Sequence, residues 1–512
     1  MSRLKQLTRS IFSGYVTLGM NILCTAASVP LALSYLPREE FGMWALVTQV
    51  VGYLMLVDLG MTASIGRVLI DHKDQAAAGG YGSVVRTGWR VLVVQGAIIF
   101  VLSLAAGFGL PGLLKVPPHL VPSFRMLVAG HGLLTGALFF YRIYGCVLHA
   151  QQRHDVGNYA LVGSFAVNFA VLWTGFHFQW GLYSLLLAHG AGMLCQAMTL
   201  GVAAHRLGLM PPRTGRGRVD GKVFKELFVF GGDIFLLALG LQLVSASQIV
   251  IISSTLGLEA AAVWAVASKG FTMAQQIVWR LWDFSASTIG EMIVRDERAR
   301  LRRRFSEIYL VTASASVFIG LGVAVGNAPL LALWTGGRIA WEPLNDLLMA
   351  GLFFTNSVTR LHGGLLGTAK NIGGLRFIYF LEGVSFVTLS FFVAPRWGMP
   401  GILAAALGTN LLWTGLYGTH RTAQELGVSF GEVAWRWLRP ALGYALVLAP
   451  AGLLCHWLSR PLPAAARLTV GVAVMGLAGG AMFWKFGLSP PLRAELRAGL
   501  AKARARFRTS RA

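Results

Sequence analysis

Long apolar runs recur along almost the whole 512-residue chain, and they limit its possible folds more than any other feature. A helix needs about 20 mostly apolar residues to cross the hydrocarbon core of a bilayer. The sequence therefore predicts an all-α polytopic membrane protein with about 14 transmembrane helices. Their expected ranges are 11–35, 41–66, 88–110, 121–146, 156–177, 181–205, 226–253, 258–282, 306–327, 346–367, 374–394, 399–421, 438–458 and 465–486.

Charged residues make up only 13% of the chain. Soluble proteins carry roughly 25%, so this composition excludes an ordinary soluble enzyme and a disordered chain. The charge is also unbalanced, with 44 Lys and Arg against 21 Asp and Glu. Basic residues gather on the cytoplasmic side of transmembrane helices and bind anionic headgroups there. The excess of cations thus fits the surface of a membrane.

Basic residues alternate strongly between successive loops, which predicts cytoplasmic N and C termini. With that orientation the external segments hold only Arg38, Lys115, Arg125, Arg338, Arg396, Arg460 and Arg467. One missing helix would destroy the alternation. The external loops are short, the longest covering roughly 327–345.

The two halves of the chain share short motifs at an offset of about 220 residues. Trp44-Ala45 corresponds to Trp264-Ala265, Asp58 to Asp283, and Arg142 to Arg360. The offset spans an even number of helices, so the two copies have the same orientation, which is typical of parallel transporter repeats. The predicted domains are a six-helix bundle at 1–205, a basic cytoplasmic linker at 206–225, a second six-helix bundle at 226–421, two additional helices at 422–486 and a basic amphipathic tail at 487–512.

No catalytic or metal-binding motif is recognisable in the sequence. The four cysteines are far apart, and none forms a CxxC pair or a Cys/His cluster. GxSxG, HExxH, P-loop and EF-hand spacings do not occur. We therefore predict a non-enzymatic protein with no catalytic residues, no metal site and no cofactor, apart from a coupling proton or sodium ion.

Two stretches carry a resemblance to a known family. They are 36–46 (LPREEFGMWAL) with 56–60 (LVDLG), and 145–159 with its central QQRHD. These resemble the first hairpin and the loop after the fourth helix in bacterial polysaccharide flippases of the multidrug/oligosaccharidyl-lipid/polysaccharide exporter superfamily. Residues His149-Ala150 stand where family members often have glycine before Gln151.

The resemblance implies transport of an undecaprenyl-pyrophosphate-linked oligosaccharide from the cytoplasmic to the periplasmic leaflet. It also implies alternating access around a central cationic cavity, and surface polysaccharide assembly with glycosyltransferases and a glycan polymerase as pathway partners. Three alternatives remain open: a drug or small-metabolite exporter of the same superfamily, a membrane glycan polymerase or ligase, and a structural scaffold. The short loops disfavour the polymerase or ligase because they leave no room for a catalytic domain.

Lys269 is a candidate substrate-binding residue because it lies about eleven residues into an expected span. A diphosphate crossing the membrane needs fixed cations, since unpaired buried charge is costly. Its repeat counterpart is Gln49, so the two bundles would offer a cation and an amide to one cavity. The alternatives are a lysine that reaches the membrane interface or pairs with a structural carboxylate.

Arginines near the cytoplasmic ends of expected spans are further candidates, because the guanidinium donates bidentate hydrogen bonds to phosphate. Arg142 and Arg360 could receive the diphosphate, or anchor helix ends to lipid phosphates. Asp58 has Arg67 nearby and Asp283 has Arg280. These two acids are expected to form structural ion pairs or helix caps, with ion coupling as the alternative. The four arginines complete the predicted substrate-binding set.

Glu382 is the other deeply placed acid. It is a candidate for proton or sodium coupling, or for an ion pair with Arg376. The tail places Leu492, Leu496 and Leu500 on one helical face among basic residues, which predicts a helix lying on anionic lipids. No nucleic-acid partner is expected, because base-reading side chains are missing between the cations.

Overall fold

The computed structural model describes residues 3–72, 80–151, 153–212, 215, 217–369, 371, 373–488, 490, 493–494 and 497. Within these residues all regular secondary structure is helical, which confirms the predicted fold class. Most of the predicted amphipathic tail lies outside the described residues.

Eleven described helical segments are long and apolar enough to cross a membrane. One of them, Leu375–Leu426, covers two predicted spans. Two further predicted spans lie outside these eleven segments: 258–282 corresponds to the short helix α10 followed by α11, and 346–367 corresponds to α13. The multi-pass membrane architecture is therefore confirmed, while the number of fourteen spans and the side on which the termini lie stay predictions.

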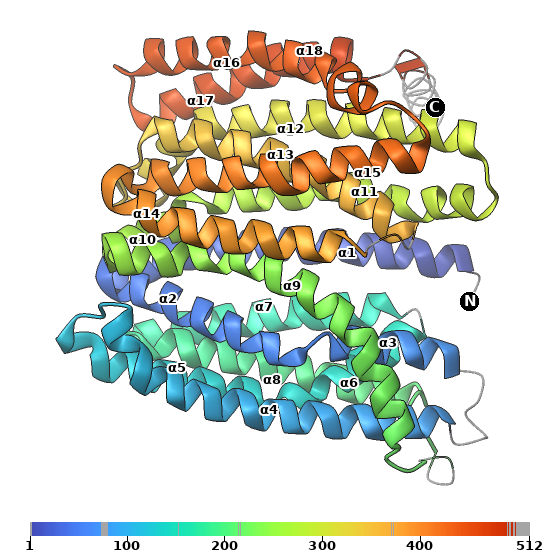
Figure 1. The fold of residues 1–512 in the computed structure, drawn as a ribbon. Coiled ribbons are helices and arrows are strands. Elements are labelled where there is room, and N and C mark those ends of the chain that lie inside the picture. Colours follow the sequence, from blue (N-terminus) through green and yellow to red (C-terminus); the bar gives the residue numbers. More distant parts are fainter. Residues whose placement is uncertain are drawn as a thin grey trace, which may run out of the picture. The chain divides into compact units, whose positions relative to one another are not determined.

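The chain divides into two compact units, Met1–Val266 and Ala267–Ala512. In unit 1, long helices run side by side (Figure 1), with α7 packed between α1 and α8, and α4 against α5. Its elements are α1 (Arg3–Tyr35), α2 (Arg38–Leu54), η1 (Met55–Asp58), α3 (Met61–His72), α4 (Gly80–Leu113), η2 (Pro118–Leu120), α5 (Val121–Ala137), η3 (Phe139–Tyr141), α6 (Arg142–Ala150), α7 (His154–His177), α8 (Tyr183–Arg206), α9 (Gly221–Leu256) and α10 (Leu258–Ala267), which ends at the boundary.

In unit 2, α12 forms the centre of the packing and lies mainly against α11, α13, α16 and α17. The elements of this unit are α11 (Lys269–Val294), α12 (Arg298–Trp334), α13 (Pro343–Thr368), α14 (Leu375–Asn410), η5 (Leu411–Gly415), α15 (Leu416–Leu426), η6 (Glu432–Arg436), α16 (Arg439–Ser459), α17 (Ala464–Val474), η7 (Met475–Gly479), α18 (Gly480–Met482) and η8 (Phe483–Gly487). Because α12 continues to Trp334, the connection predicted at 327–345 is shorter than expected.

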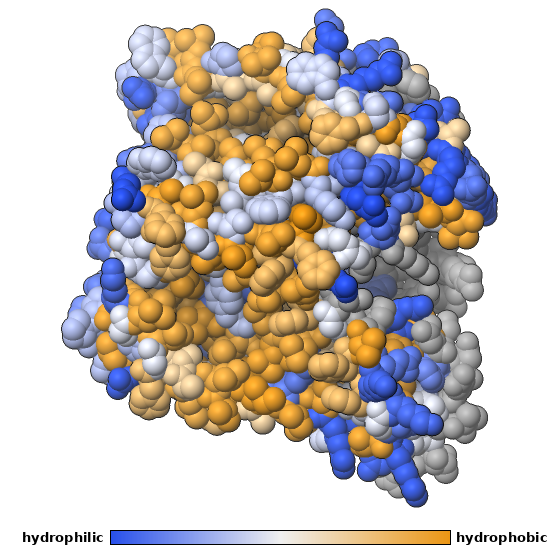
Figure 2. Space-filling view, viewed as in Figure 1, coloured by the Kyte–Doolittle hydropathy of each residue, from blue (hydrophilic) through white to orange (hydrophobic). Residues whose placement is uncertain are grey.

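Apolar side chains cover the middle of the helices, and hydrophilic side chains gather toward the helix ends (Figure 2). Many of the apolar side chains are exposed on the protein, among them Leu102, Phe108, Leu446 and Leu454. In water such a surface would aggregate, whereas in a bilayer it faces hydrocarbon. The surface agrees with the multi-pass architecture.

Helix α9 packs within unit 1, although the repeat pattern assigns it to the second bundle. The backbone of Leu258 and Gly42 come into close contact where α10 begins, and Tyr53 on α2 is hydrogen-bonded to Ser247 on α9. These contacts tie α9 and the start of α10 to α2. The domain boundaries that the sequence repeat predicts stay a prediction.

Gly398 turns the chain back on itself within α14. Its φ of 58° and ψ of −144° are not helical, and they separate the predicted spans 374–394 and 399–421. Beyond the turn, Asn410 reaches Glu382 and Trp413 reaches Ser385. Residues this far apart in one straight helix could not meet, so the two spans form an antiparallel hairpin.

Replacing Gly60 with alanine is expected to destabilise unit 1. Gly60 has a φ of 72° and a Cβ there would lie 2.5 Å from the carbonyl oxygen of Gly231 on α9. The left-handed backbone alone costs an alanine about 1–2 kcal/mol, and the clash adds to that. The measurement is the thermal unfolding midpoint of the purified full-length protein.

Gly66→Ala is the matched control, because a Cβ at Gly66 on α3 meets no atom within 4 Å. Its midpoint should stay equal or rise, since alanine favours a helix over glycine by about 1 kcal/mol. Equal midpoints for the two variants would contradict the close approach of α9 to the α2–α3 break.

Candidate functional site

Two helix breaks in unit 1 bring Asp58 and Arg142 together. The helix of the second predicted span ends at Asp58, and Leu59 and Gly60 follow in the left-handed conformation before α3 begins. The fourth predicted span is broken in a similar way, because the tight turn η3 separates α5 from α6. Arg142 is the first residue of α6. Each side chain therefore leaves the backbone where a span is interrupted.

The Arg142 guanidinium is held by three contacts. Its Nη1 lies 3.5 Å from Asp58 Oδ1 and donates to Thr62 Oγ1 at 3.3 Å. Its Cζ lies 4.4 Å from the centre of the Phe139 ring. Thr62 in turn donates its hydroxyl to Asp58 Oδ1 at 2.5 Å. The carboxylate thus caps the start of α3 and holds the arginine over an aromatic face.

Gln95 on α4 supports the break from behind. Its Nε2 donates to the backbone oxygens of Val57 (2.8 Å) and Asp58 (3.0 Å). These carbonyls end a helix and need partners when buried. The sequence analysis did not predict this supporting role of Gln95.

Unit 2 repeats the arrangement with Asp283 and Arg360. Arg360 Nη2 on α13 donates to Asp283 Oδ1 on α11 at 3.0 Å. The Arg360 Cζ lies 4.4 Å from the centre of the Trp279 ring. In unit 2 the stacking ring, Trp279, lies on the same helix as Asp283. In unit 1 the stacking ring, Phe139, lies in η3, just before Arg142. Both copies therefore contain a carboxylate, a guanidinium and an aromatic ring in contact, but the ring comes from a different position in each copy.

Arg280 and Arg67 complete the predicted set of arginines. Arg280 Nη1 lies 4.0 Å from Asp283 Oδ2, which agrees with the expected proximity. Arg67 is exposed on α3, and the arginine that pairs with Asp58 is Arg142. The sequence identified the repeated acids and the repeated arginines as separate pairs, and the structure joins them within each copy.

Both repeated arginines are partly exposed beside their carboxylates. The side chain of Arg142 is 28% exposed and that of Arg360 is 38% exposed. A partly exposed ion pair contributes only about 0.2–1 kcal/mol to stability. Arg360 Nε is buried without a hydrogen-bond partner in the described part of the chain. A phosphate with several oxygens could therefore replace the single carboxylate and use more of the donors.

Lys269 lies at a break that sequence patterns did not predict. Ser268 separates α10 from α11, and Lys269 begins α11 half-buried. Asn327 on α12 fixes the break, because its Nδ2 donates to the Ala267 carbonyl at 3.2 Å and to Asp346 Oδ1 at 2.7 Å. Within the described residues no ion pair involves Lys269. This leaves its cation available to a ligand.

Asn327 and Asp346 were missed as candidates. Asp346 also accepts a hydrogen bond from Trp341 Nε1 at 2.8 Å, and both polar side chains are buried. The available signal was their position, since they lie at the facing ends of two successive predicted spans. Gln49, the repeat counterpart of Lys269, is half-buried in an unbroken part of α2. The helix break beside Lys269 is thus found in the second copy of the repeat, whereas the helix is continuous at the corresponding position, Gln49, of the first copy.

Glu382 is buried in α14, and its Oε1 accepts from Asn410 Nδ2 at 3.0 Å. Asn410 Nδ2 also donates to Thr414 Oγ1 at 3.0 Å. The second oxygen, Oε2, has no hydrogen-bond partner among the described atoms. Arg376, the alternative partner expected for Glu382, has its guanidinium 4.9 Å from the Phe377 ring centre.

The sequence matches a known protein family. A model of the family described as "Polysaccharide biosynthesis protein" matches residues 9–281, which is more than half of the chain. The chain belongs to this family. The matched region contains Asp58, Arg142 and Lys269, and it covers unit 1 from residue 9 onward. No curated protein matches the sequence.

Solved structures share the fold. An inward-facing multidrug resistance MATE family transporter of the MOP superfamily has a TM-score of 0.64 and 13% identity, covering 83% of this chain and 99% of its own. A MOP superfamily transporter from Pyrococcus furiosus has a TM-score of 0.59 and 10% identity, covering 83% and 96%. The Vibrio cholerae MATE transporter VcmN in its bent form has a TM-score of 0.55 and 14% identity, covering 87% and 98%. These similarities show that the chain has the fold of these transporters.

Among the described residues, no group of three or more His, Cys, Asp or Glu side chains is placed to hold a metal ion. The candidate residues therefore form one Asp–Arg–aromatic grouping in each unit, and unit 2 adds one lysine. Arginine and lysine cations are the side chains that proteins use to bind phosphate and other anions.

Proposed function

We propose that this protein flips an undecaprenyl-pyrophosphate-linked oligosaccharide from the cytoplasmic to the periplasmic leaflet of the bacterial inner membrane. The repeated pairing of Asp58 with Arg142 and of Asp283 with Arg360 carries the proposal. A guanidinium stacked on a ring and held by one carboxylate is oriented for a diphosphate, which offers a bidentate partner of higher charge. Membership of a polysaccharide biosynthesis family supports a glycan cargo.

In this proposal the arginines exchange partners during transport. An incoming diphosphate binds Arg142 in place of Asp58, or Arg360 in place of Asp283. When the cargo leaves, the carboxylate pairs with the arginine again. The arginine is therefore not left unpaired in a poorly hydrated site. Lys269 supplies a further cation along the path, and Gln49 with Arg67 and Arg280 completes the set. Glycosyltransferases and a glycan polymerase are the proposed pathway partners.

A drug exporter of the same superfamily is the second candidate, because several proteins with this fold are multidrug transporters. Two arginines stacked on rings would repel a cationic drug. The observed side chains thus favour an anionic cargo.

Loss of the gene in its own host tests the cargo. We expect surface polysaccharide to disappear and the lipid-linked oligosaccharide to accumulate on the cytoplasmic leaflet, where an impermeant reagent added to spheroplasts cannot reach it. A mutant that keeps its polysaccharide and becomes sensitive to cationic dyes would instead support the drug exporter.

Glu382 is the proposed coupling group, for a proton or a sodium ion. Its buried Oε2 lacks a hydrogen-bond partner among the described residues, and a bound proton or cation would remove the cost of that buried charge. Glu382→Gln keeps the shape and the contact with Asn410. We expect this variant to transport without responding to an imposed proton or sodium gradient in proteoliposomes.

Asp58→Asn provides the comparison for Glu382→Gln. This acid is already paired with an arginine, so its replacement should leave the gradient dependence intact. A gradient response that survives in Glu382→Gln would remove Glu382 from the coupling mechanism.

A further inference from the structure

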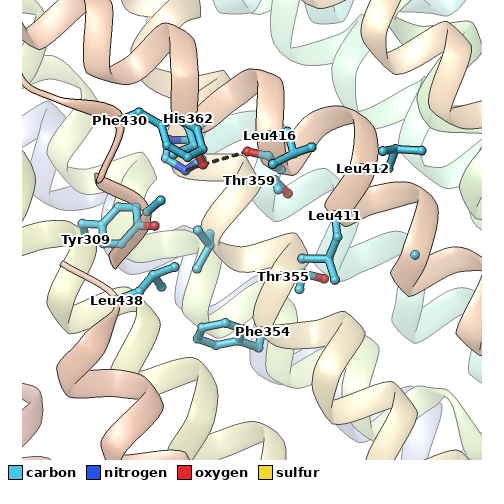
Figure 3. A pocket seen from close by; sticks show the side chains of 15 residues that line it. Tyr309, Phe354, Thr355, Thr359, His362, Leu411, Leu412, Leu416, Phe430 and Leu438 are labelled. Carbon is cyan, nitrogen blue, oxygen red and sulfur yellow. Dashed lines mark hydrogen bonds between the residues drawn. The ribbon is translucent and has the colours of Figure 1, made fainter. Parts of the chain in front are cut away.

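Unit 2 contains a cavity of about 430 Å³ that the transport proposal does not use. Side chains from four helical regions line it: α12, α13, the end of α14 with η5 and α15, and the segment leading into α16 (Figure 3). Asp283 and Arg360 are not among the lining residues. The cavity is thus separate from the candidate anion site of this unit.

The lining is almost entirely apolar, and its polar groups are largely satisfied within the protein. Thr355 and Thr359 donate to backbone oxygens of their own helix, at 3.1 and 3.3 Å. His362 Nδ1 lies 2.8 Å from the Thr422 hydroxyl. An apolar cavity of this kind does not hold water or sugar hydroxyls. Its natural occupant is a hydrocarbon chain.

Hydrocarbon from the bilayer can reach this cavity. Leu411, Leu412 and Leu416 line it and are also exposed on the protein. They lie in the apolar segment Leu375–Leu426, which is long enough to span the membrane. Their surroundings are therefore acyl chains, and one such chain can enter without leaving an apolar environment.

One polar group in the wall lacks a partner. The Tyr309 hydroxyl is buried and has no hydrogen-bond partner among the described residues, and its oxygen points toward the cavity (Figure 3). A buried hydroxyl without a partner is costly. The ester carbonyl of a glycerophospholipid would accept from it, whereas the hydrocarbon of a polyprenyl chain has no acceptor.

Exposed cations stand beside the same wall. Arg436 and Arg439 are exposed and flank Leu438, which lines the cavity. The ring of the intervening Trp437 lies 5.7 Å from the Tyr309 ring. The two cations therefore lie on the chain segment that packs against Tyr309. Charge bias predicts that this side faces the cytoplasm, where the leaflet is anionic.

We propose that unit 2 holds one anionic glycerophospholipid of the inner leaflet. An acyl chain fills the cavity, the Tyr309 hydroxyl donates to its ester carbonyl, and Arg436 and Arg439 hold the phosphate. This lipid is a resident of the fold and not the cargo, so the site goes beyond the proposed flippase activity.

The test is native mass spectrometry of the delipidated full-length protein titrated with phosphatidylglycerol. We expect one tightly retained lipid. Arg436→Gln with Arg439→Gln should weaken binding about 30-fold at low salt, and Tyr309→Phe about fivefold. Gly408→Phe should prevent retention, because Gly408 lines the cavity and a Cβ there meets no atom within 4 Å.

Two controls match these variants. Gly443→Phe places the same ring at an exposed glycine of α16 that is also free of contacts and does not line the cavity. Arg396→Gln removes an exposed arginine elsewhere in unit 2. Both should bind phosphatidylglycerol like the wild type.

Three results would overturn the proposal. They are unchanged binding in Gly408→Phe, equal binding of phosphatidylcholine, and displacement of the lipid by undecaprenyl phosphate at equal concentration. The last result would make the cavity a site for the polyprenyl tail. None of these outcomes depends on flipping, so the lipid site can fail while the proposed function stands.

Discussion

Arg142→Ala is expected to abolish surface polysaccharide while the amount of protein in the membrane stays normal. The variant loses the donor that we propose for the diphosphate. A hydrogen bond to a charged group contributes about 1.5–3 kcal/mol, and its loss corresponds to more than a tenfold loss of rate. Arg360→Ala should have the same effect, because its grouping with Asp283 and Trp279 repeats the first one. Immunoblots of polysaccharide and of the protein measure both quantities.

A set of partner variants separates substrate binding from a structural ion pair. If Arg142 serves only to hold Asp58, then Asp58→Asn should be as harmful as Arg142→Ala. If Arg142 binds phosphate, Asp58→Asn should be milder and Arg142→Lys should still lose most activity, since lysine lacks the planar fork. Arg125→Ala is the control, because its guanidinium stacks on Phe108 of the neighbouring helix without a role in the proposal. Equal loss in Asp58→Asn and Arg142→Ala would contradict phosphate binding.

Lys269→Met is expected to reduce polysaccharide export at least tenfold. Methionine keeps most of the apolar volume and removes only the charge. Lys269 is half-buried at the α10–α11 break and makes no ion pair with a described residue, so its positive charge is costly in the absence of an anion. The measurement is surface polysaccharide at matched protein level.

Lys269→Arg should retain part of the export, because it keeps a cation at the same place. Lys115→Met, outside the membrane segments, should be neutral. Normal export by Lys269→Met would show that the lysine only reaches an interface, which was the alternative left open by the sequence.

The sequence predicted the helical membrane architecture because the apolar length of a span is a property of many residues. The turn at Gly398 was placed correctly between two spans. The breaks at Leu59–Gly60 and at Ser268 were not predicted, because the apolar pattern continues through them. Such breaks depend on neighbours far along the chain, such as Gln95 and Asn327, whose amides satisfy the interrupted backbone.

The sequence identified candidate residues, but it did not predict which of them contact one another. Repeat matching found Asp58 with Asp283 and Arg142 with Arg360, since a duplication preserves spacing. It could not show that each acid meets the arginine of its own copy, because that contact is set by helix packing. The stacking rings Phe139 and Trp279 have no corresponding positions in the two copies, so no repeat could reveal them.

Reconstituted flipping tests the proposed function most directly. Proteoliposomes would contain the full-length protein and a fluorescent polyprenyl-diphosphate oligosaccharide in both leaflets, and an impermeant enzyme added outside would modify the glycan. We predict that the wild type makes the inner-leaflet share accessible, and that Arg142→Ala combined with Arg360→Ala leaves that share protected. An inner-leaflet share that stays protected with the wild-type protein, in vesicles that accumulate a cationic drug, would contradict the assignment of a glycolipid cargo.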